Sequence, residues 1–115
     1  MNKDENCIFC KIESGDMPAD MVFEDDKVIV FKDISPKAPV HLLIVPREHI
    51  ESLDEMDASH GDLLAHMMLL LPKLAKEQGL EKGFRTVINT GRGGGQIVFH
   101  LHIHLLGDPN GLGGR

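Results

Sequence analysis

Short apolar runs separated by turn-forming residues make up most of the chain and predict a sheet of five strands. The expected strands span 21–24, 28–31, 40–45, 85–89 and 97–106. These runs are rich in Val, Ile, Leu and Phe, as is typical of strands. Asp25 and Asp26 lie in the turn between the first two runs, which predicts a hairpin.

A long run of apolar residues at helical spacing occurs at 58–78. Seven apolar residues there share one helix face: Leu63, Leu64, Met67, Met68, Leu71, Leu74 and Ala75. Pro72 lies inside the run and predicts a kink. A shorter helix is expected over 7–14. Five strands with one long and one short helix predict an α+β fold with an antiparallel meander sheet, rather than a doubly wound parallel sheet.

Size and charge limit the possible classes of protein. The 115 residues are expected to form a single domain, 1–115, with flexible tails over 1–6 and 108–115. The formal net charge of −6 argues against a nucleic-acid partner. The longest apolar run, Met67 to Leu71, is too short to cross a membrane, and the polar first residues do not resemble a signal peptide. We therefore expect a cytoplasmic protein.

Three histidines alternate with apolar residues at the end of the chain. His100, His102 and His104 would share one face of a strand. The apolar residues between and beside them would share the other face: Phe99, Leu101, Ile103 and Leu105. Isolated histidines are usually ordinary surface or core residues, but three in strict alternation are hard to explain in that way. Two chemical interpretations remain, a metal site and nucleophilic catalysis by an imidazole.

A glycine-rich segment, Gly91 to Gln96, directly precedes these histidines. Glycines tolerate positive φ and allow consecutive N–H groups to converge on an anion. The segment matches neither the P-loop nor the dinucleotide-binding pattern, and glycine-rich turns are usually only turns. Beside three imidazoles, however, it indicates a phosphate held next to an imidazole nucleophile.

The segment from His100 to Leu106 is similar to the His-φ-His-φ-His-φ-φ motif (φ apolar) of the histidine triad superfamily, and the chain most resembles its Hint branch of nucleotide-binding proteins. The resemblance extends from Cys7 to Gly107. It includes Phe23-Glu24-Asp25-Asp26, Asp33-Ile34-Ser35-Pro36, Ala38-Pro39-Val40-His41, Ile44-Val45-Pro46, Asn89 and Gly94-Gly95-Gln96. It implies a homodimer with a joined ten-stranded sheet, and hydrolysis of purine nucleoside 5′-phosphoramidates.

The resemblance also implies roles for four histidines. His102 would attack the α-phosphorus, expel the amine and form a nucleotidyl-imidazole that water then cleaves. His104 would donate or relay the proton that the amine needs, and His41 would complete the relay. The carbonyl group of His100 would accept a hydrogen bond from His102 and fix its tautomer.

By the same resemblance, the phosphate would be held by Asn89 and by the loop residues Gly95, Gln96 and Ile97. Asp33 would accept the ribose hydroxyls, although an aspartate before Ser-Pro can also simply cap a loop. An apolar slot would hold the base, and it would consist of Ile8, Phe9, Ile12, Phe31 and Ile34. Many relatives carry a polar residue at the position of Ile97, so the sequence does not predict the leaving amine.

Cys7 and Cys10 form a C-x-x-C pair near the N-terminus. A redox motif should follow a strand in a βαβ unit, so half of a zinc site is the better interpretation, and two packed thiols are the simplest one. The resemblance to some bacterial relatives suggests His49 and His100 as the other ligands. The family's chemistry requires no metal, so any zinc would be structural.

Three other functions are compatible with these residues. The histidines could serve only for recognition in a non-catalytic nucleotide-binding adaptor, or could bind zinc in a metal-dependent hydrolase. A related branch of the superfamily cleaves dinucleoside polyphosphates. His60 and His66 lie on the predicted long helix and are expected to be surface or interface residues.

Overall fold

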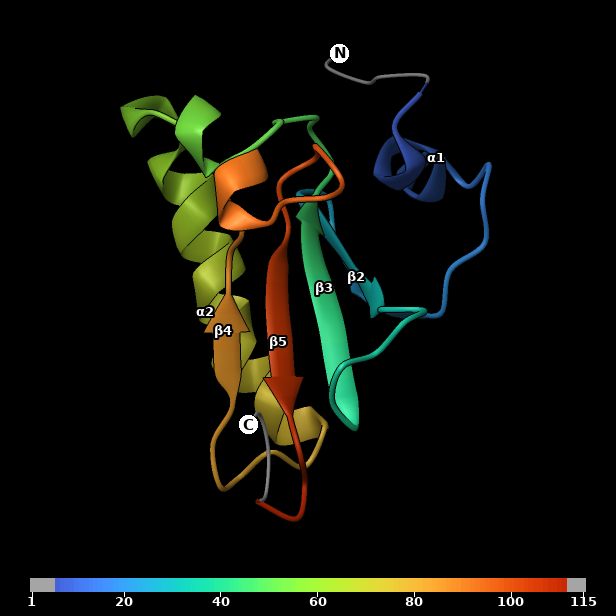
Figure 1. The fold of residues 1–115 in the computed structure, drawn as a ribbon, viewed down its shortest axis with the longest axis vertical. Helices are drawn as coiled ribbons and strands as arrows, with labels where there is room; N and C mark the ends of the chain where they lie inside the picture. The colour runs from blue at the N-terminus through green and yellow to red at the C-terminus, as the bar shows by residue number, and fades with distance from the viewer. Residues whose placement is uncertain (1–5, 112–115) are drawn as a thin grey trace.

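A computed structural model describes residues 6–111 (Figure 1). Five antiparallel strands form one sheet: β1 (Met21–Glu24), β2 (Val28–Lys32), β3 (Val40–Pro46), β4 (Arg85–Val87) and β5 (Ile103–Gly107). The two α-helices are α1 (Ile8–Ser14) and α2 (Gly61–Glu77), and three short 3₁₀ turns are η1 (Leu53–Glu55), η2 (Ala58–His60) and η3 (Arg92–Gly94). The α+β fold expected from the sequence is confirmed.

The strand order in the sheet is β1-β2-β3-β5-β4. The first three strands are consecutive neighbours, but the chain then runs through α2 to the edge strand β4. It returns through the glycine-rich segment, so that β5 lies between β3 and β4 (Figure 1). The order therefore departs from a simple meander in one place, and this departure makes β3 and β5 neighbours.

Alternating side chains of β2 and β3 fill two separate apolar layers. One layer contains Val28, Val30, Leu42 and Ile44 together with the buried side of α2. The other layer contains Ile29, Phe31, Leu43 and Val45 together with residues of α1. The two helices therefore cover opposite faces of the sheet.

Helix α1 begins at a cysteine and ends at a glycine. The Cys7 sulfur accepts a hydrogen bond from the Cys10 N–H at 3.4 Å, which caps the helix start. Gly15 ends the helix with φ of 89°, a left-handed conformation that favours glycine. The sequence prediction of a helix over 7–14 is confirmed.

Helix α2 begins later than its apolar pattern predicted. Residues 58–60 form η2, in which Asp57 Oδ1 accepts the Ser59 N–H at 2.9 Å. The buried residues of α2 are Met67, Leu70, Leu71, Leu74 and Ala75. Met68, which was expected on this face, is 40% exposed, because Leu70 packs against the core instead. The kink expected at Pro72 stays a prediction.

Two strands are shorter than predicted because their ends bond to loops. Strand β4 ends at Val87 rather than 89, and the Asn89 side chain donates a hydrogen bond to the Gly94 carbonyl group. Strand β5 begins at Ile103 rather than 97, since the Leu101 N–H donates to the Ile50 carbonyl group at 2.6 Å. Phe99, expected on the apolar face, is half-exposed and lies outside both apolar layers.

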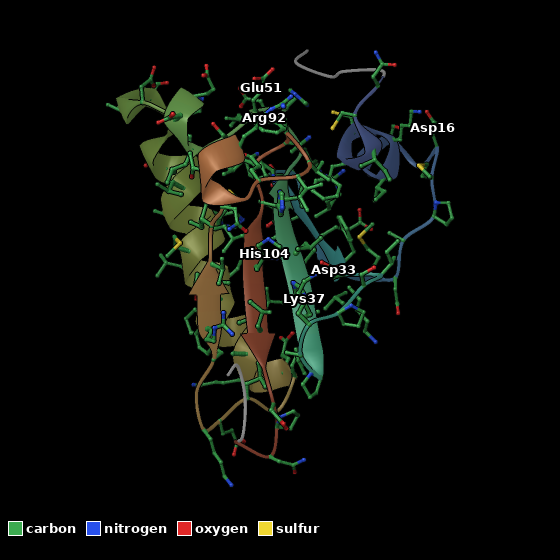
Figure 2. The ribbon with its side chains drawn as sticks, viewed as in Figure 1. Asp16, Asp33, Lys37, Glu51, Arg92 and His104 are labelled. Carbon is green, nitrogen blue, oxygen red and sulfur yellow. The ribbon has the colours of Figure 1, made fainter. Side chains whose placement is uncertain are left out.

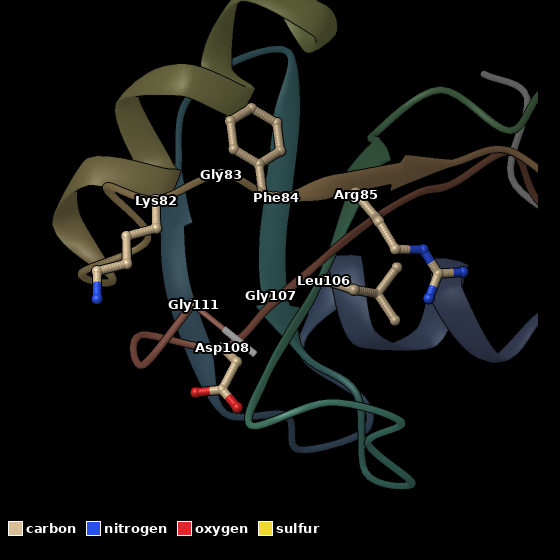
Figure 3. A pocket seen from close by; sticks show the side chains of 8 residues that line it. All are labelled: Lys82, Gly83, Phe84, Arg85, Leu106, Gly107, Asp108 and Gly111. Carbon is tan, nitrogen blue, oxygen red and sulfur yellow. The ribbon is translucent and has the colours of Figure 1, made fainter. Parts of the chain in front are cut away.

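The described end of the chain turns after β5. The Gly111 N–H donates to the Asp108 carbonyl group at 2.8 Å, and this turn borders a small cavity of about 230 Å³ (Figure 3). Arg85 and Leu106 line it together with Lys82, Gly83, Phe84, Gly107, Asp108 and Gly111. Residues 1–5 and 112–115, where most of the expected flexible tails fall, lie outside the described residues. Among the described helices, none has the length and apolar character needed to cross a membrane.

Candidate active site

A cavity of about 780 Å³ lies on the α1 side of the sheet, over β3, β4 and β5. Figure 2 shows Asp33, Lys37 and His104 gathered on this side. The lining residues are Ile8, Phe9, Asp33, Ile34, Ser35, Lys37, His41, Arg85, Val87, Asn89, Gly95, Ile97, Val98, His104 and Leu106. Many of the residues that the sequence singled out are therefore brought to one place.

Two histidines from neighbouring strands form a hydrogen-bonded pair in this cavity. His41 of β3 lies with its Nε2 2.9 Å from Nδ1 of His104 in β5. The Lys37 N–H donates to His41 Nδ1 at 3.1 Å, so the proton of neutral His41 must be on Nε2. His41 then donates to His104 Nδ1, and neutral His104 carries its own proton on Nε2.

His102 has the opposite tautomer. Its Nδ1–H donates to the His100 carbonyl group at 2.7 Å, and the lone pair is therefore on Nε2. The ring is buried, and its centroid lies 4.9 Å from that of His104 and 5.0 Å from that of Phe9. His102 is not itself among the lining residues, but both of these neighbours are.

All three imidazoles are neutral near pH 7. Burial lowers the pKa of His102 below its ordinary value of 6.5, and the hydrogen bond to the His100 carbonyl group only partly opposes this effect. Burial also lowers the pKa of His41, against the attraction of Asp33. Burial and the neighbouring histidines lower the pKa of His104 to about 4. The site thus offers a neutral nucleophile beside a neutral N–H donor.

Asp33 has two different contacts. Its Oδ1 accepts the Ser35 N–H at 2.8 Å, which is the loop cap considered from the sequence. Its Oδ2 lies 3.4 Å from His41 Nε2 and borders the cavity. Asp33, His41 and His104 also place one ligand atom each within 4.8 Å of one another, so they form a set that could hold a cation.

The glycine-rich segment is shaped by its own hydrogen bonds. Gly91 and Gly95 have φ of 71° and 85°, which only glycine adopts readily. The Gln96 side chain accepts the Gly91 N–H and donates to the carbonyl groups of Glu51 and Val98. Gln96 is 5% exposed. Its side chain therefore holds the loop in shape and does not line the cavity, whereas Asn89 and Gly95 do. The nucleotide contact expected of Gln96 stays a prediction.

The apolar wall of the cavity is only part of the predicted slot. Ile8, Phe9 and Ile34 line it, and Ile34 is 93% exposed at the edge. Phe31 does not line it, because it is buried between α1 and the sheet, and Ile12 is packed against the same layer. Ile97, directly after the glycine-rich segment, also lines the cavity and is 89% exposed.

Four further side chains that could bind a metal ion lie close together beside α1. Cys7 Sγ lies 3.3 Å from His100 Nδ1, and Cys10 Sγ lies 3.2 Å from His49 Nδ1 and 3.5 Å from His100 Nδ1. All four ligand atoms lie within 4.8 Å of one another. We call this set the Cys₂His₂ cluster.

The Cys₂His₂ cluster suits a tetrahedral ion in size and chemistry. Zinc bonds of about 2.0–2.3 Å imply donor–donor distances of about 3.3–3.8 Å, close to those present. His100 Nε2 lies 2.8 Å from the Pro46 carbonyl group, so Nε2 carries the proton and Nδ1 presents its lone pair to the sulfurs. Burial raises the pKa of the Cys7 thiol to about 11, so a thiolate there needs a cation.

Six cavity residues were not anticipated as site residues from the sequence: Ser35, Lys37, Arg85, Val87, Val98 and Leu106. Arg85 and Val87 pair with Leu106 and His104, and so lie on the same face as the histidines. Their period-two spacing was visible in the sequence, but the adjacency of β4 and β5 was not. The backbone N–H of Lys37 leaves no signal in the sequence, because any residue except proline supplies that donor.

Comparisons with known proteins show the family of this chain. The family described as "Scavenger mRNA decapping enzyme C-term binding" matches residues 6–114. Protein HitA of Neisseria gonorrhoeae is 54% identical over 105 residues, which are 91% of this chain and 98% of that protein. The purine nucleoside phosphoramidase of Escherichia coli K12 is 44% identical over 104 residues, covering 90% of this chain and 87% of that protein.

Solved structures give the same result. A HIT family hydrolase from Legionella pneumophila Philadelphia 1 has a TM-score of 0.87 at 48% identity, and the match covers 89% of this chain and 92% of the other. A HIT family hydrolase from Clostridium thermocellum has a TM-score of 0.88 at 44% identity over 98% and 94% of the two chains. The chain therefore belongs to the histidine triad superfamily and is an enzyme of the HIT type.

Proposed function

We propose that the protein hydrolyses purine nucleoside 5′-phosphoramidates to a nucleoside monophosphate and an amine. The observation that carries this proposal is the pair of opposite tautomers: His102 has its lone pair on Nε2 and His104 has its proton on Nε2, in rings whose centroids are 4.9 Å apart. Attack of an imidazole on phosphorus needs the lone pair of His102, and departure of an amine needs the N–H donor of His104. The name of the E. coli relative supports the same substrate class.

In the first step, His102 Nε2 forms a bond to the α-phosphorus while the bond from phosphorus to the amine nitrogen breaks. The electron pair of that bond stays on the amine, which takes a proton from His104 Nε2. The positive charge of the resulting nucleotidyl-imidazolium balances the negative charge that the lost proton leaves on the His41–His104 pair. Water then attacks phosphorus, returns a proton to His104 and releases His102 and the nucleotide.

The rest of the cavity supports binding of such a substrate. The Asn89 side chain and the backbone around Gly95 and Ile97 would hold phosphate oxygens as charge develops. Asp33 Oδ2 would accept the ribose hydroxyls, and Ile8, Phe9 and Ile34 would contact the base. Ile97 offers the amine only an apolar surface.

We also propose that the Cys₂His₂ cluster holds zinc and that the protein is a homodimer. Zinc there would cross-link α1 to the segments that contain His49 and His100, and supply folding free energy. No step of the reaction involves the ion. His100 would serve as a zinc ligand through its ring and as a support for His102 through its carbonyl group.

The decisive experiment is to trap the covalent intermediate. The protein is mixed with an adenosine 5′-phosphoramidate, quenched within milliseconds without acid, digested and analysed by mass spectrometry. We expect an added adenylyl group on the peptide that contains His102, and its loss in His102→Ala. His60→Ala, a histidine variant on η2 outside the cavity, should retain both the adduct and turnover.

Other outcomes identify the competing functions. Turnover without an adduct on His102, abolished by EDTA in a protein that stays folded, would favour a zinc-dependent hydrolase. Binding of AMP without turnover would favour a nucleotide-binding adaptor. Faster cleavage of a dinucleoside polyphosphate than of the phosphoramidate would favour that other branch of the superfamily.

A further inference from the structure

We infer that the Cys₂His₂ cluster positions the nucleophile, so that binding of a divalent metal ion between Cys7, Cys10, His49 and His100 sets the rate at which His102 reacts. The kinetic part of this inference rests on the proposed function. The cluster lies outside the cavity, and none of its four residues is among those that line it. Two separate chains of contacts lead from the cluster to His102.

The first chain of contacts passes through His100. Its ring is fully buried, with Nδ1 directed at both sulfurs and Nε2–H donating to the Pro46 carbonyl group. Its own carbonyl group accepts the His102 Nδ1–H at 2.7 Å. The residue that the ion would bind therefore also fixes the tautomer and the direction of the His102 ring.

The second chain of contacts passes through α1. Phe9 lies between Cys7 and Cys10 in the sequence, and its ring meets the ring of His102 edge to face at 5.0 Å. The same ring contacts His100 at 5.9 Å and lines the cavity. An ion bound by both cysteines would hold Phe9 against one side of the nucleophile.

The small size of helix α1 indicates that its position depends on such a cross-link. It has seven residues, too few for an isolated helix to be stable, and it takes no part in the strand ladder. Its other end is joined to the residue directly after β3 by the ion pair between Glu13 and Arg47. The end that carries Phe9 is packed against the cluster.

The charges also favour an ion in this place. Two thiolates and two neutral imidazoles carry two negative charges, which a divalent cation neutralises within a buried site. Without the cation, two neutral thiols would make only weak hydrogen bonds to the histidines. The hold on His100 and on α1 would then be looser, and the His102 ring would sample more orientations.

The test compares the full chain with zinc and after removal of zinc by a chelator, with metal content measured in both. Long-range ¹H–¹⁵N NMR spectra of the histidine rings report directly on His102. With zinc, we expect one sharp set of signals for His102 with the proton on Nδ1. After removal, this set should shift or broaden. This readout does not require any activity.

Kinetics provide the second readout. We expect removal of zinc to lower kcat for an adenosine 5′-phosphoramidate about 10-fold, the scale of a misplaced catalytic group, and re-addition of zinc to restore it. The Kd for AMP should change less than kcat, because Asp33, Asn89 and the glycine-rich segment would hold its ribose and phosphate, and only the base contacts of Ile8 and Phe9 come from α1. A purely structural ion would lower kcat and AMP affinity together with the folded fraction, which circular dichroism monitors.

Variants separate the two chains of contacts. His49→Ala removes a ligand and should reproduce the zinc-free state, whereas His49→Cys keeps four ligands and should restore kcat. If His49→Ala does not fold, Phe9→Leu still tests the inference: it keeps all four ligands and its zinc content, but should lower kcat. His60→Ala is the matched control and should change neither readout.

The inference would be overturned if the chain bound no zinc, or if the His102 signals were the same with and without it. It would also be overturned if kcat did not respond to zinc in a protein that hydrolyses the phosphoramidate. A zinc-loaded protein that hydrolyses no phosphoramidate, yet shows the response of the His102 signals, would disprove the proposed function and leave the positioning role standing.

Discussion

His104 lies between His41 and His102, and its two ring nitrogens have different environments. Its Nδ1 accepts a hydrogen bond from His41, which leaves Nε2–H to donate elsewhere. Its charged form is disfavoured by burial first, then by His102, His41 and Lys37, and only Asp33 favours it. A neutral donor at this position is therefore maintained by the surrounding residues.

This environment predicts a loss of stability in acid. The pKa of His104 is about 4 in the folded protein against 6.5 ordinarily, so the unfolded chain takes up the proton first. Above pH 6.5 the group contributes no penalty. As the pH falls from 6.5 to about 4, the free energy of unfolding should fall by up to about 1.4 kcal/mol per pH unit.

Urea unfolding at a series of pH values measures this effect. His104→Gln should lose less stability than the wild type over the same window, because the residue that takes up the proton has been removed. The free energy of unfolding of the variant should still fall somewhat with pH, since burial also lowers the pKa of His41 and of His102. Equal slopes for the variant and the wild type would contradict the assignment.

Among the elements, the turn between β1 and β2 joins segments that are distant in sequence. Arg47, directly after β3, donates to Glu13 of α1, to Glu24 of β1 and to the Asp25 carbonyl group, at 2.7–2.9 Å. His66 of α2 lies with Nε2 2.7 Å from Asp25 Oδ2. His66, expected to be an ordinary surface or interface residue, therefore connects the helix on one face to the sheet.

We expect Arg47→Ala to lower the free energy of unfolding by about 2 kcal/mol, because one guanidinium supports three partners and Glu13 is largely buried. Urea denaturation measures the change. The matched control is Lys32→Ala, whose pair with Asp20 is 3.6 Å apart and exposed, and which should cost less than about 0.5 kcal/mol. Similar losses in the two variants would show that the Arg47 contacts contribute little.

At the scale of the whole molecule, α2 and the segment before β4 present apolar residues to solvent. Met68 and Leu69 of α2 are 40% and 73% exposed, and Phe84 before β4 is half-exposed. β4 is also an edge strand, which can pair with another strand. These features support the homodimer that the resemblance implies.

Analytical ultracentrifugation should therefore give twice the mass of one chain. Replacing both Met68 and Leu69 with Glu should shift the protein to the monomer, since two charges cannot be buried without partners. Met21→Glu is the control, because Met21 is similarly exposed but lies on β1, at the other edge of the sheet. A monomeric wild type would disprove the dimer.

The sequence by itself determined the features that depend on local spacing. The α+β class, the five strands, both helices and the alternation of histidines with apolar residues follow from periods of two and 3.6 residues. That alternation persists in the segment before β5, which is not paired with another strand. Leu101 packs in one apolar layer, while His100 and His102 contact Phe9 on the other side. Burial of alternate side chains thus persists without strand pairing.

Only the tertiary structure decided which distant groups meet. The pairing of β3 with β5 brings His41 to His104 across 63 residues, and packing of α1 brings Cys7 to His100 across 93. It also decided that the Gln96 side chain bonds within the loop and that β5 begins only at Ile103, because the Leu101 N–H donates outside the ladder. Such choices depend on competition among hydrogen-bond partners and on packing across the whole chain, and the spacing of residues in a sequence contains neither.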